Sequence, residues 1–162
     1  MTCGNTVADG NLGVTTSTTG QGFQRATMFV NSGKWYWEVT ITTAGSQPFV
    51  GMFNTAINFN GGSLVGSAGP VLYGYDGKYY NETTGVSFGN TYTTNDVIGI
   101  AVDYDNNLIW FSKNGTWQNS GDPSSGTNGK SFGSGKTWGT GYVESGSSAS
   151  PSTFDANFGQ RP

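Results

Sequence analysis

The 162-residue chain contains no histidine and a single cysteine, Cys3. Without imidazole it has neither the Ser-His or Cys-His pairs of nucleophilic catalysis nor a histidine ligand for a metal. A lone cysteine cannot close an internal disulfide, so the fold does not depend on an oxidising compartment. These shortages argue against most hydrolase and metal-centre chemistries.

Charge is also scarce. Only 10% of the residues are charged, the net charge is -3, and the lysines and arginines are scattered singly along the chain. Nucleic-acid binding depends on a basic stripe or patch that contacts phosphates. We therefore expect no nucleic-acid partner.

Long apolar runs are missing as well. No stretch approaches the roughly 18 consecutive apolar residues of a membrane-spanning helix, and the start of the chain has neither a basic segment nor an apolar one. The sequence thus predicts no signal peptide and no membrane insertion.

Aromatic residues, in contrast, are abundant at 14%, and the chain has 27 glycines. Short segments of alternating apolar and polar residues are separated by turn residues, and apolar residues do not recur with helical spacing for more than one turn. This pattern predicts an all-β fold of two antiparallel sheets packed as a sandwich, with no significant helix.

Residues 96–117 form the strongest of these patterns, three strands joined by two tight turns. With a two-residue Asn-Asn turn, Tyr104 faces Ile109 and Val102 faces Phe111, so that four apolar side chains share one face. Such a meander cannot bury this face alone. We therefore expect the rest of the chain to supply an opposing sheet.

Residues 34–42 form the second strong strand. Alternation places Trp35, Trp37, Val39 and Ile41 on one face, which we assign to the core. In the apolar run that follows, Gly51 indicates a buried strand that a neighbouring backbone approaches closely.

Two long polar segments separate the strand patterns. Residues 54–70 and 119–141 are rich in glycine, serine and asparagine, and we interpret both as loops. Phe132 and Trp138 are exceptions within the second segment. An aromatic ring in such a loop either anchors the loop or contacts a ligand, and the sequence leaves both roles open.

Carboxylates could serve a glycosidase or a calcium site, and the sequence can be compared with the motif of each. No glutamate begins the E-x-D-x-x-E strand of sandwich-fold glycosidases. Asp103, Asp105 and Asn107 match the first ligands of a calcium loop, but Leu108 stands where glycine is needed and Asn114 where a bidentate glutamate is needed. A hairpin capped by Asx side chains accounts for the same residues and is favoured over calcium. We predict no catalytic, cofactor or metal site.

Six ordered motifs carry a family resemblance. The chain resembles the SPRY domain from about residue 22 to residue 162, through GKWYWEV (33–39), VGM (50–52), YGY (73–75), DVIGIAVD (96–103), LIWFSKNG (108–115) and NFG (157–159). Six blocks in order are far more specific than any single one. The resemblance implies a bent, concanavalin-like sandwich and a non-catalytic role in recognising partners through loops at one end.

The resemblance also sets the expected organisation. Residues 1–162 form one domain, in which 1–21 give a weak initial strand or hairpin and 22–162 the SPRY core. Low charge and glycine-rich loops are similar to those of SPRY domains in bacteriophage and environmental virion proteins. We therefore expect a domain excised from a larger protein of a virion or cell-surface particle. The cytoplasm is the alternative location. We expect the isolated domain to be a monomer.

The expected partner is a protein or peptide, or a glycan on a host surface. The resemblance places the binding surface at residues 54–69 and 145–151. Loop composition then selects five candidate ligand-binding residues, Phe59, Asn60, Lys136, Trp138 and Tyr142. Two alternatives to protein recognition stay open: a carbohydrate-binding module, and a structural spacer domain of a fibre.

Overall fold

The computed structural model of the protein describes residues 4–17, 22–54, 71–81, 84–134, 137–145 and 150–160. Within these ranges the helical content is one short 3-10 turn, η1 (Asp9–Asn11). The prediction of an all-β fold without significant helix is confirmed.

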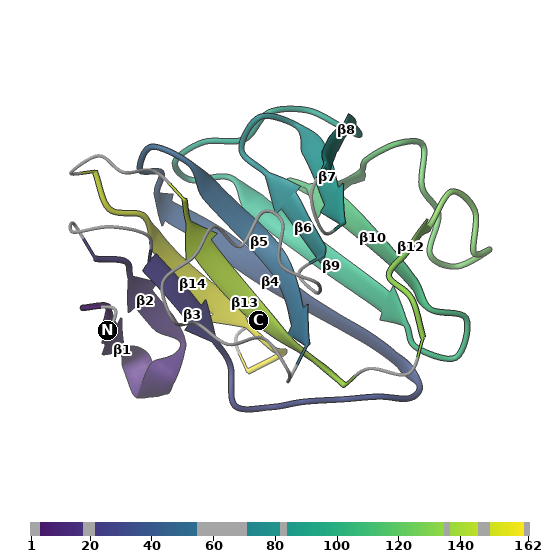
Figure 1. The fold of residues 1–162 in the computed structure, drawn as a ribbon, viewed down its shortest axis with the longest axis horizontal. Helices are drawn as coiled ribbons and strands as arrows, with labels where there is room; N and C mark the ends of the chain where they lie inside the picture. Colours follow the sequence, from purple (N-terminus) through teal and green to yellow (C-terminus); the bar gives the residue numbers. More distant parts are fainter. Residues whose placement is uncertain are drawn as a thin grey trace.

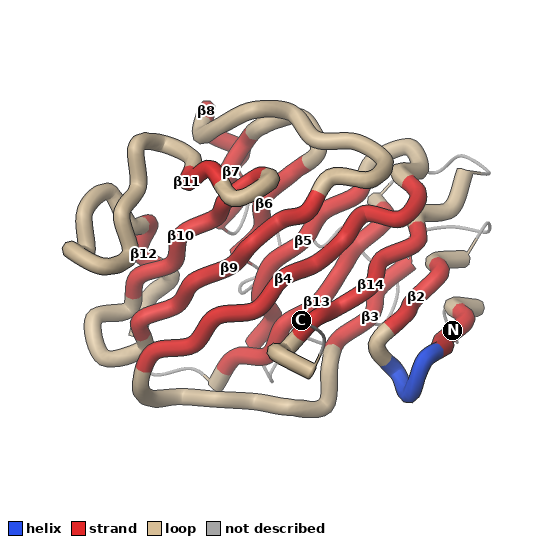
Figure 2. Tube along the Cα trace, turned by 180° about the vertical axis from the view of Figure 1, so that it is seen from behind, coloured by secondary structure: helices blue, strands red, loops and turns tan. Residues whose placement is uncertain are grey.

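The strands form two antiparallel sheets, and Figures 1 and 2 show them stacked as two layers. The first sheet has the order β1 (Thr6–Ala8), β2 (Gly13–Thr15), β14 (Thr153–Asn157), β4 (Lys34–Thr43), β9 (Val97–Asp103), β10 (Leu108–Lys113) and β11 (Thr116–Trp117), with β12 (Lys130–Ser131) also paired to β10. The second has the order β3 (Gly22–Arg25), β13 (Trp138–Glu144), β5 (Pro48–Asn54), β6 (Val71–Gly74), β7 (Lys78–Asn81) and β8 (Thr84–Ser87). As expected, β1 and β2 pair as an N-terminal hairpin.

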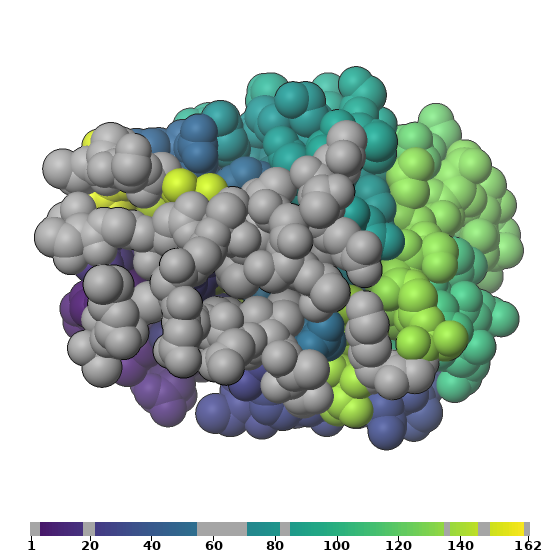
Figure 3. Space-filling model, viewed as in Figure 1, coloured from purple at the N-terminus to yellow at the C-terminus, as the bar shows by residue number. Residues whose placement is uncertain are grey.

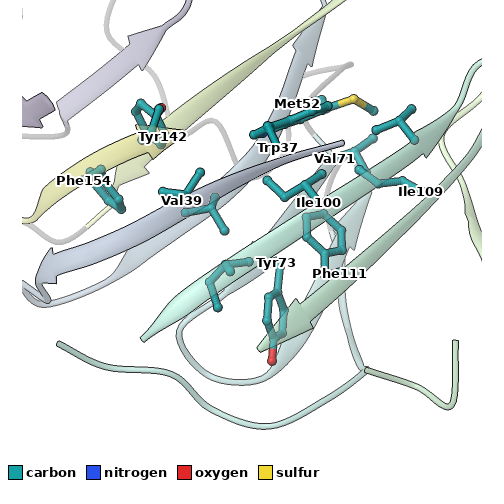
Figure 4. Packing of buried hydrophobic residues seen from close by; sticks show 14 of the residues in the cluster. Trp37, Val39, Met52, Val71, Tyr73, Ile100, Ile109, Phe111, Tyr142 and Phe154 are labelled. Atoms are coloured by element: carbon teal, nitrogen blue, oxygen red, sulfur yellow. The ribbon is translucent and has the colours of Figure 1, made fainter. Parts of the chain in front are cut away.

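The core lies between the two inner faces and consists largely of rings and β-branched side chains. The ring of Tyr73 on β6 lies 5.6 Å from that of Phe111 on β10, and Phe111 also packs edge-on against Phe88 at 6.0 Å. Figure 4 shows Tyr73 and Phe111 side by side within this layer. The inner faces are apolar because alternate positions of each strand point inward.

Strand β4 follows its predicted alternation with one exception. Trp37, Val39 and Ile41 are buried as expected, whereas Trp35 is 44% exposed. Trp35 begins the strand beside the β3–β4 connection, and its indole nitrogen donates to the carbonyl of Ser32. The assignment of Trp35 to the core is therefore wrong, because its ring lies at the surface, where it lines a groove beside β13.

The β9–β10 register also differs from the prediction. Val102 pairs with Ile109 and Ile100 with Phe111, a shift of two residues that lengthens the turn. The Asp103 carboxylate stabilises the longer turn by accepting hydrogen bonds from the Asn106 backbone and side-chain amides. A shift of two keeps every side chain on its predicted face, so the predicted apolar face is still confirmed.

Part of the predicted 119–141 loop is folded onto the outer face of the first sheet. The indole nitrogen of Trp110 donates to Thr127, at 2.8 Å, and Gly121 and Gly129 lie against the same ring. The Asp122 carboxylate accepts hydrogen bonds from Ser124 and Ser125, which closes the tight turn at the tip. Trp110 is thus buried beneath this segment and not between the sheets.

Gly51 meets its neighbour as closely as the sequence suggests. A Cβ atom at this position would lie 2.0 Å from the backbone carbonyl oxygen of Val71 on β6. A side chain there cannot fit unless the two paired strands separate.

We expect Gly51→Ala to lower the free energy of unfolding by about 1–3 kcal/mol or more, as overpacked cores do. Gly13→Ala is the matched control, since its Cβ would meet only ordinary contacts at 3.6 Å and beyond. Urea denaturation of both variants measures the difference. Equal stability of the two variants would contradict the close approach at Gly51.

Candidate functional site

The five sequence-predicted ligand residues divide into two groups. Phe59, Asn60 and Lys136 lie outside the described residues. Trp138 and Tyr142 are described, and both lie on β13 of the second sheet with their rings buried.

Trp138 is a core residue of a strand, so its placement in a loop is wrong. Its side chain is only 1% exposed, and its ring packs edge-on against that of Phe132 at 5.5 Å. The neighbouring glycines suggested a loop, but they are required by close packing. A Cβ at Gly139 would lie 2.8 Å from the ring of Phe29, and one at Gly141 2.4 Å from the ring of Phe53.

Tyr142 joins the two sheets. Its ring stacks on that of Phe154 of β14, with the centroids 5.0 Å apart and the planes 12° from parallel. Burial, and secondarily the charge of Asp155, raises the pKa of the Tyr142 hydroxyl well above its usual value. Tyr142 is therefore a neutral core ring, and one side of it lines the groove described below.

The two predicted binding loops do not leave the fold at the same end. Residue 54 ends β5 where Asn54 pairs with Trp138, whereas residue 145 follows β13 where Glu144 pairs with Pro48. These two pairs lie at opposite ends of the β5–β13 ladder. The expectation that both loops start from one end of the sandwich is wrong.

The Glu144 carboxylate anchors the end from which residues 145–150 depart. It accepts hydrogen bonds from the backbone of Gln47, at 2.7 Å, and from the hydroxyl of Ser152, at 2.5 Å. The Ser152 hydroxyl accepts in turn from the backbone of Gly45, and Thr16 bonds to the Ser152 backbone. Glu144 and Ser152 together therefore hold the ends of four chain segments relative to one another.

A second apolar cluster lies on the outer face of the second sheet. It consists of Phe23, Phe49, Phe53, Leu72 and Val143, all buried, with Tyr75 and Tyr80 packed against it. The Tyr80 hydroxyl donates to the Asp76 carboxylate at 2.8 Å. Because these side chains are already buried, this face offers little apolar surface to a partner.

Exposed apolar surface gathers elsewhere. The large apolar side chains that are exposed among the described residues are Val7, Met28, Trp35, Tyr36 and Val86, and all except Val86 line two adjoining grooves. One groove, of about 590 Å³, lies between the N-terminal hairpin and β3, and the other, of about 210 Å³, lies beside the start of β4. Met28 and Phe158 line both, so we treat them as one surface, the edge groove.

The β3–β4 connection forms one wall of the edge groove. Residues 26–33 run along the border of the sandwich, which Figures 1 and 2 show as the long segment below the strands, and Figure 3 shows it at the lower border of the surface. The backbone of Ala26 bonds to Thr140 and that of Val30 to Trp138, so the connection is fixed to β13. Met28, between these two attachments, is 49% exposed.

The carboxylates of the β9–β10 turn are engaged within the protein. Asp103 accepts from Asn106 and forms an ion pair with Lys34 at 3.3 Å. The Asn106 hydrogen bonds, and then Lys34, hold the pKa of the Asp103 carboxyl below its usual value.

Among the described residues no group of three Asp, Glu or Cys side chains could hold a metal ion. The same part of the chain contains no helix long and apolar enough to cross a membrane.

The comparison with protein families identifies the family of this chain. The SPRY domain family matches residues 34–121, more than half of the chain, which include β4, β9 and β10 of the first sheet. The chain belongs to the SPRY domain family. The predicted resemblance to this family is thereby confirmed, although nothing in the comparisons supports its bacteriophage or virion branch.

Several curated proteins share this SPRY segment. A Ran-binding proteins 9/10 homolog of Drosophila melanogaster is 36% identical over 87 residues, which are 51% of this chain but 9% of that protein. Ran-binding protein 9 of Homo sapiens is 36% identical over 87 residues, 12% of its length. A probable ATP-dependent RNA helicase, ddx1 of Dictyostelium discoideum, is 33% identical over 91 residues, 11% of its length. The chain therefore matches only a small part of each relative.

Solved structures show the same fold. The crystal structure of the SPRY domain of human HERC1 superposes with a TM-score of 0.77 at 18% identity, covering 98% of this chain and 94% of that one. A second human SPRY domain superposes with a TM-score of 0.67 at 19% identity, covering 96% of each chain. These similarities establish the sandwich architecture and, at such low identity, nothing more specific.

Sequence reasoning missed the edge groove. The predicted binding residues do not include Met28, and alternation assigns Trp35 to the core. The GKWYWEV motif contained one available signal, since a strand that starts with Trp and Tyr at adjacent positions must point one ring to each face. Both rings are exposed in the structure, and the exposure of Trp35, which alternation places on the inner face, is a tertiary property.

Trp138→Ala should lower the free energy of unfolding by about 3–5 kcal/mol, as removal of a buried aromatic ring does. Trp35→Ala removes the same side chain from an exposed position and should cause a clearly smaller loss. Urea denaturation of the two variants provides the comparison. If Trp138→Ala leaves stability unchanged, its place in the core is wrong and its role as an exposed contact returns.

Proposed function

We propose that this SPRY domain is a non-catalytic module that recognises a partner protein. The concentration of exposed apolar side chains in the edge groove carries the proposal, because scattered apolar residues are ordinary on a surface whereas a contiguous cluster marks an interaction site. Family membership supports it, since SPRY domains generally serve in protein–protein interaction.

The rigid wall of the edge groove suits this role. The β3–β4 connection is fixed to β13 by backbone hydrogen bonds on both sides of Met28. A surface held in place before binding loses little conformational freedom on binding. The groove is thus a preformed receptor for a flexible segment of another protein.

The finer predictions stay proposals. The relatives named above come from animals and an amoeba, so a virion setting rests on the sequence alone. The location, in a virion or cell-surface particle or alternatively in the cytoplasm, also rests on the sequence alone. The same holds for the monomeric state. A glycan ligand and a spacer role likewise rest on the sequence alone. The small share of each relative that the chain matches favours a domain that works within a longer protein.

A displayed library of random linear peptides, screened against the purified domain, tests protein recognition. We expect specific peptide sequences to be enriched and to bind saturably, with a glycan array screened in parallel remaining silent. Glycan binding without peptide enrichment would contradict the proposal and favour the carbohydrate-binding alternative.

A further inference from the structure

The smaller part of the edge groove has the dimensions of a side-chain pocket. Its 210 Å³ exceeds the 150 Å³ cavity that accepts a benzene molecule in an engineered protein. Four aromatic residues whose rings are not committed to the outer face of the first sheet line it: Trp35, Trp37, Tyr104 and Phe158. Concave, mostly aromatic walls of this kind favour a bulky apolar side chain.

One wall of this pocket holds a polar group without a partner. Trp37 is 6% exposed, and its indole N–H has no hydrogen-bond acceptor among the described residues. Native proteins leave few buried donors unpaired, and those that occur call for an explanation. In a recognition pocket, the explanation is an acceptor that a bound molecule brings, such as a main-chain carbonyl beside the inserted side chain.

The described residues that line the edge groove carry one positive charge and no negative one. No aspartate or glutamate is among the described residues that line either part of it, and Arg25 is the single charged residue that does, although the whole chain has a net charge of -3. The Arg25 guanidinium donates to the carbonyl of Asn54 at 3.0 Å and lies 4.9 Å from the centre of the Phe29 ring. These contacts hold a positive charge at the border of an apolar surface, which complements a carboxylate.

Strand addition is disfavoured along this edge. The carbonyl of Phe23 accepts from the Asn5 side chain at 2.7 Å, and that of Arg25 accepts from the Gln24 side chain at 3.2 Å. Edge carbonyls that already accept from side-chain amides are less available to an incoming strand. Recognition here therefore depends on side chains of the partner and not on extension of the second sheet.

We propose that the edge groove binds an extended segment of a partner protein that inserts one bulky apolar side chain into the pocket beside Trp37 and places a carboxylate against Arg25. This inference rests on the proposed function and specifies the chemistry of the partner. The apolar anchor supplies most of the affinity, as buried anchors do at other interfaces, and the carboxylate fixes the direction of the segment.

The peptides enriched by the wild-type domain provide the probe. They should contain a large apolar residue and an Asp or Glu at a constant spacing. Met28→Glu places a carboxylate in the apolar wall and should weaken their binding at least tenfold, which corresponds to about 1.4 kcal/mol. Val86→Glu is the matched control, since Val86 is similarly exposed, at 48%, and lies on β8 outside the groove.

A charge exchange tests the role of Arg25. Arg25→Glu should weaken the enriched peptides, and replacement of the peptide carboxylate by Lys should restore binding to this variant while weakening binding to the wild type. Lys78→Glu, an exposed charge reversal on β7, should leave both peptides unaffected. Thermal unfolding of each variant confirms that it is folded.

The outcomes separate the two proposals. If the wild-type domain enriches no peptide, the proposed function fails. If it enriches peptides that bind Met28→Glu and wild type equally, protein recognition stands and the edge groove is overturned as its site. If Met28→Glu abolishes binding but the charge exchange restores nothing, the groove stands and the carboxylate assignment is overturned.

Discussion

The burial of aromatic rings between two sheets is the constraint on which the rest of the structure depends. The rings of Tyr73, Tyr79 and Phe88 contact that of Phe111 on β10, with centroids 5.6–6.5 Å from the Phe111 centroid. Each sheet alone would leave these rings in water, since an isolated antiparallel sheet cannot cover its own apolar face. The two layers are therefore stable only together.

The same constraint explains where the candidate site lies. The rings fill the centre of the sandwich, whereas at its border apolar side chains reach solvent at Met28 and Trp35. The edge groove is thus the uncovered margin of the core. One of its walls, the β3–β4 connection, is fixed to β13 by backbone hydrogen bonds, so the described part of the fold holds this apolar surface in place.

Much of this fold could be predicted from residue alternation, but not the parts that depend on tertiary contact. Alternation distinguishes the faces of β4, β9 and β10, yet it cannot distinguish two registers that differ by two residues, and the Asp103–Asn106 hydrogen bonds select between them. Gly139 and Gly141 suggest a loop by their residue type, yet both lie in strand β13. Glycine is needed there because a side chain would clash with the rings of Phe29 and Phe53. The exposure of Trp35 is likewise a tertiary property.

Native-state hydrogen exchange tests the mutual dependence of the sheets most directly. If neither layer is stable alone, the slowest amides of β4 and β9 in the first sheet and of β5 and β13 in the second should exchange through one global opening, with the same free energy and the same response to denaturant. Two distinct free energies, one for each sheet, would contradict the account, because one layer would then persist after the other had opened.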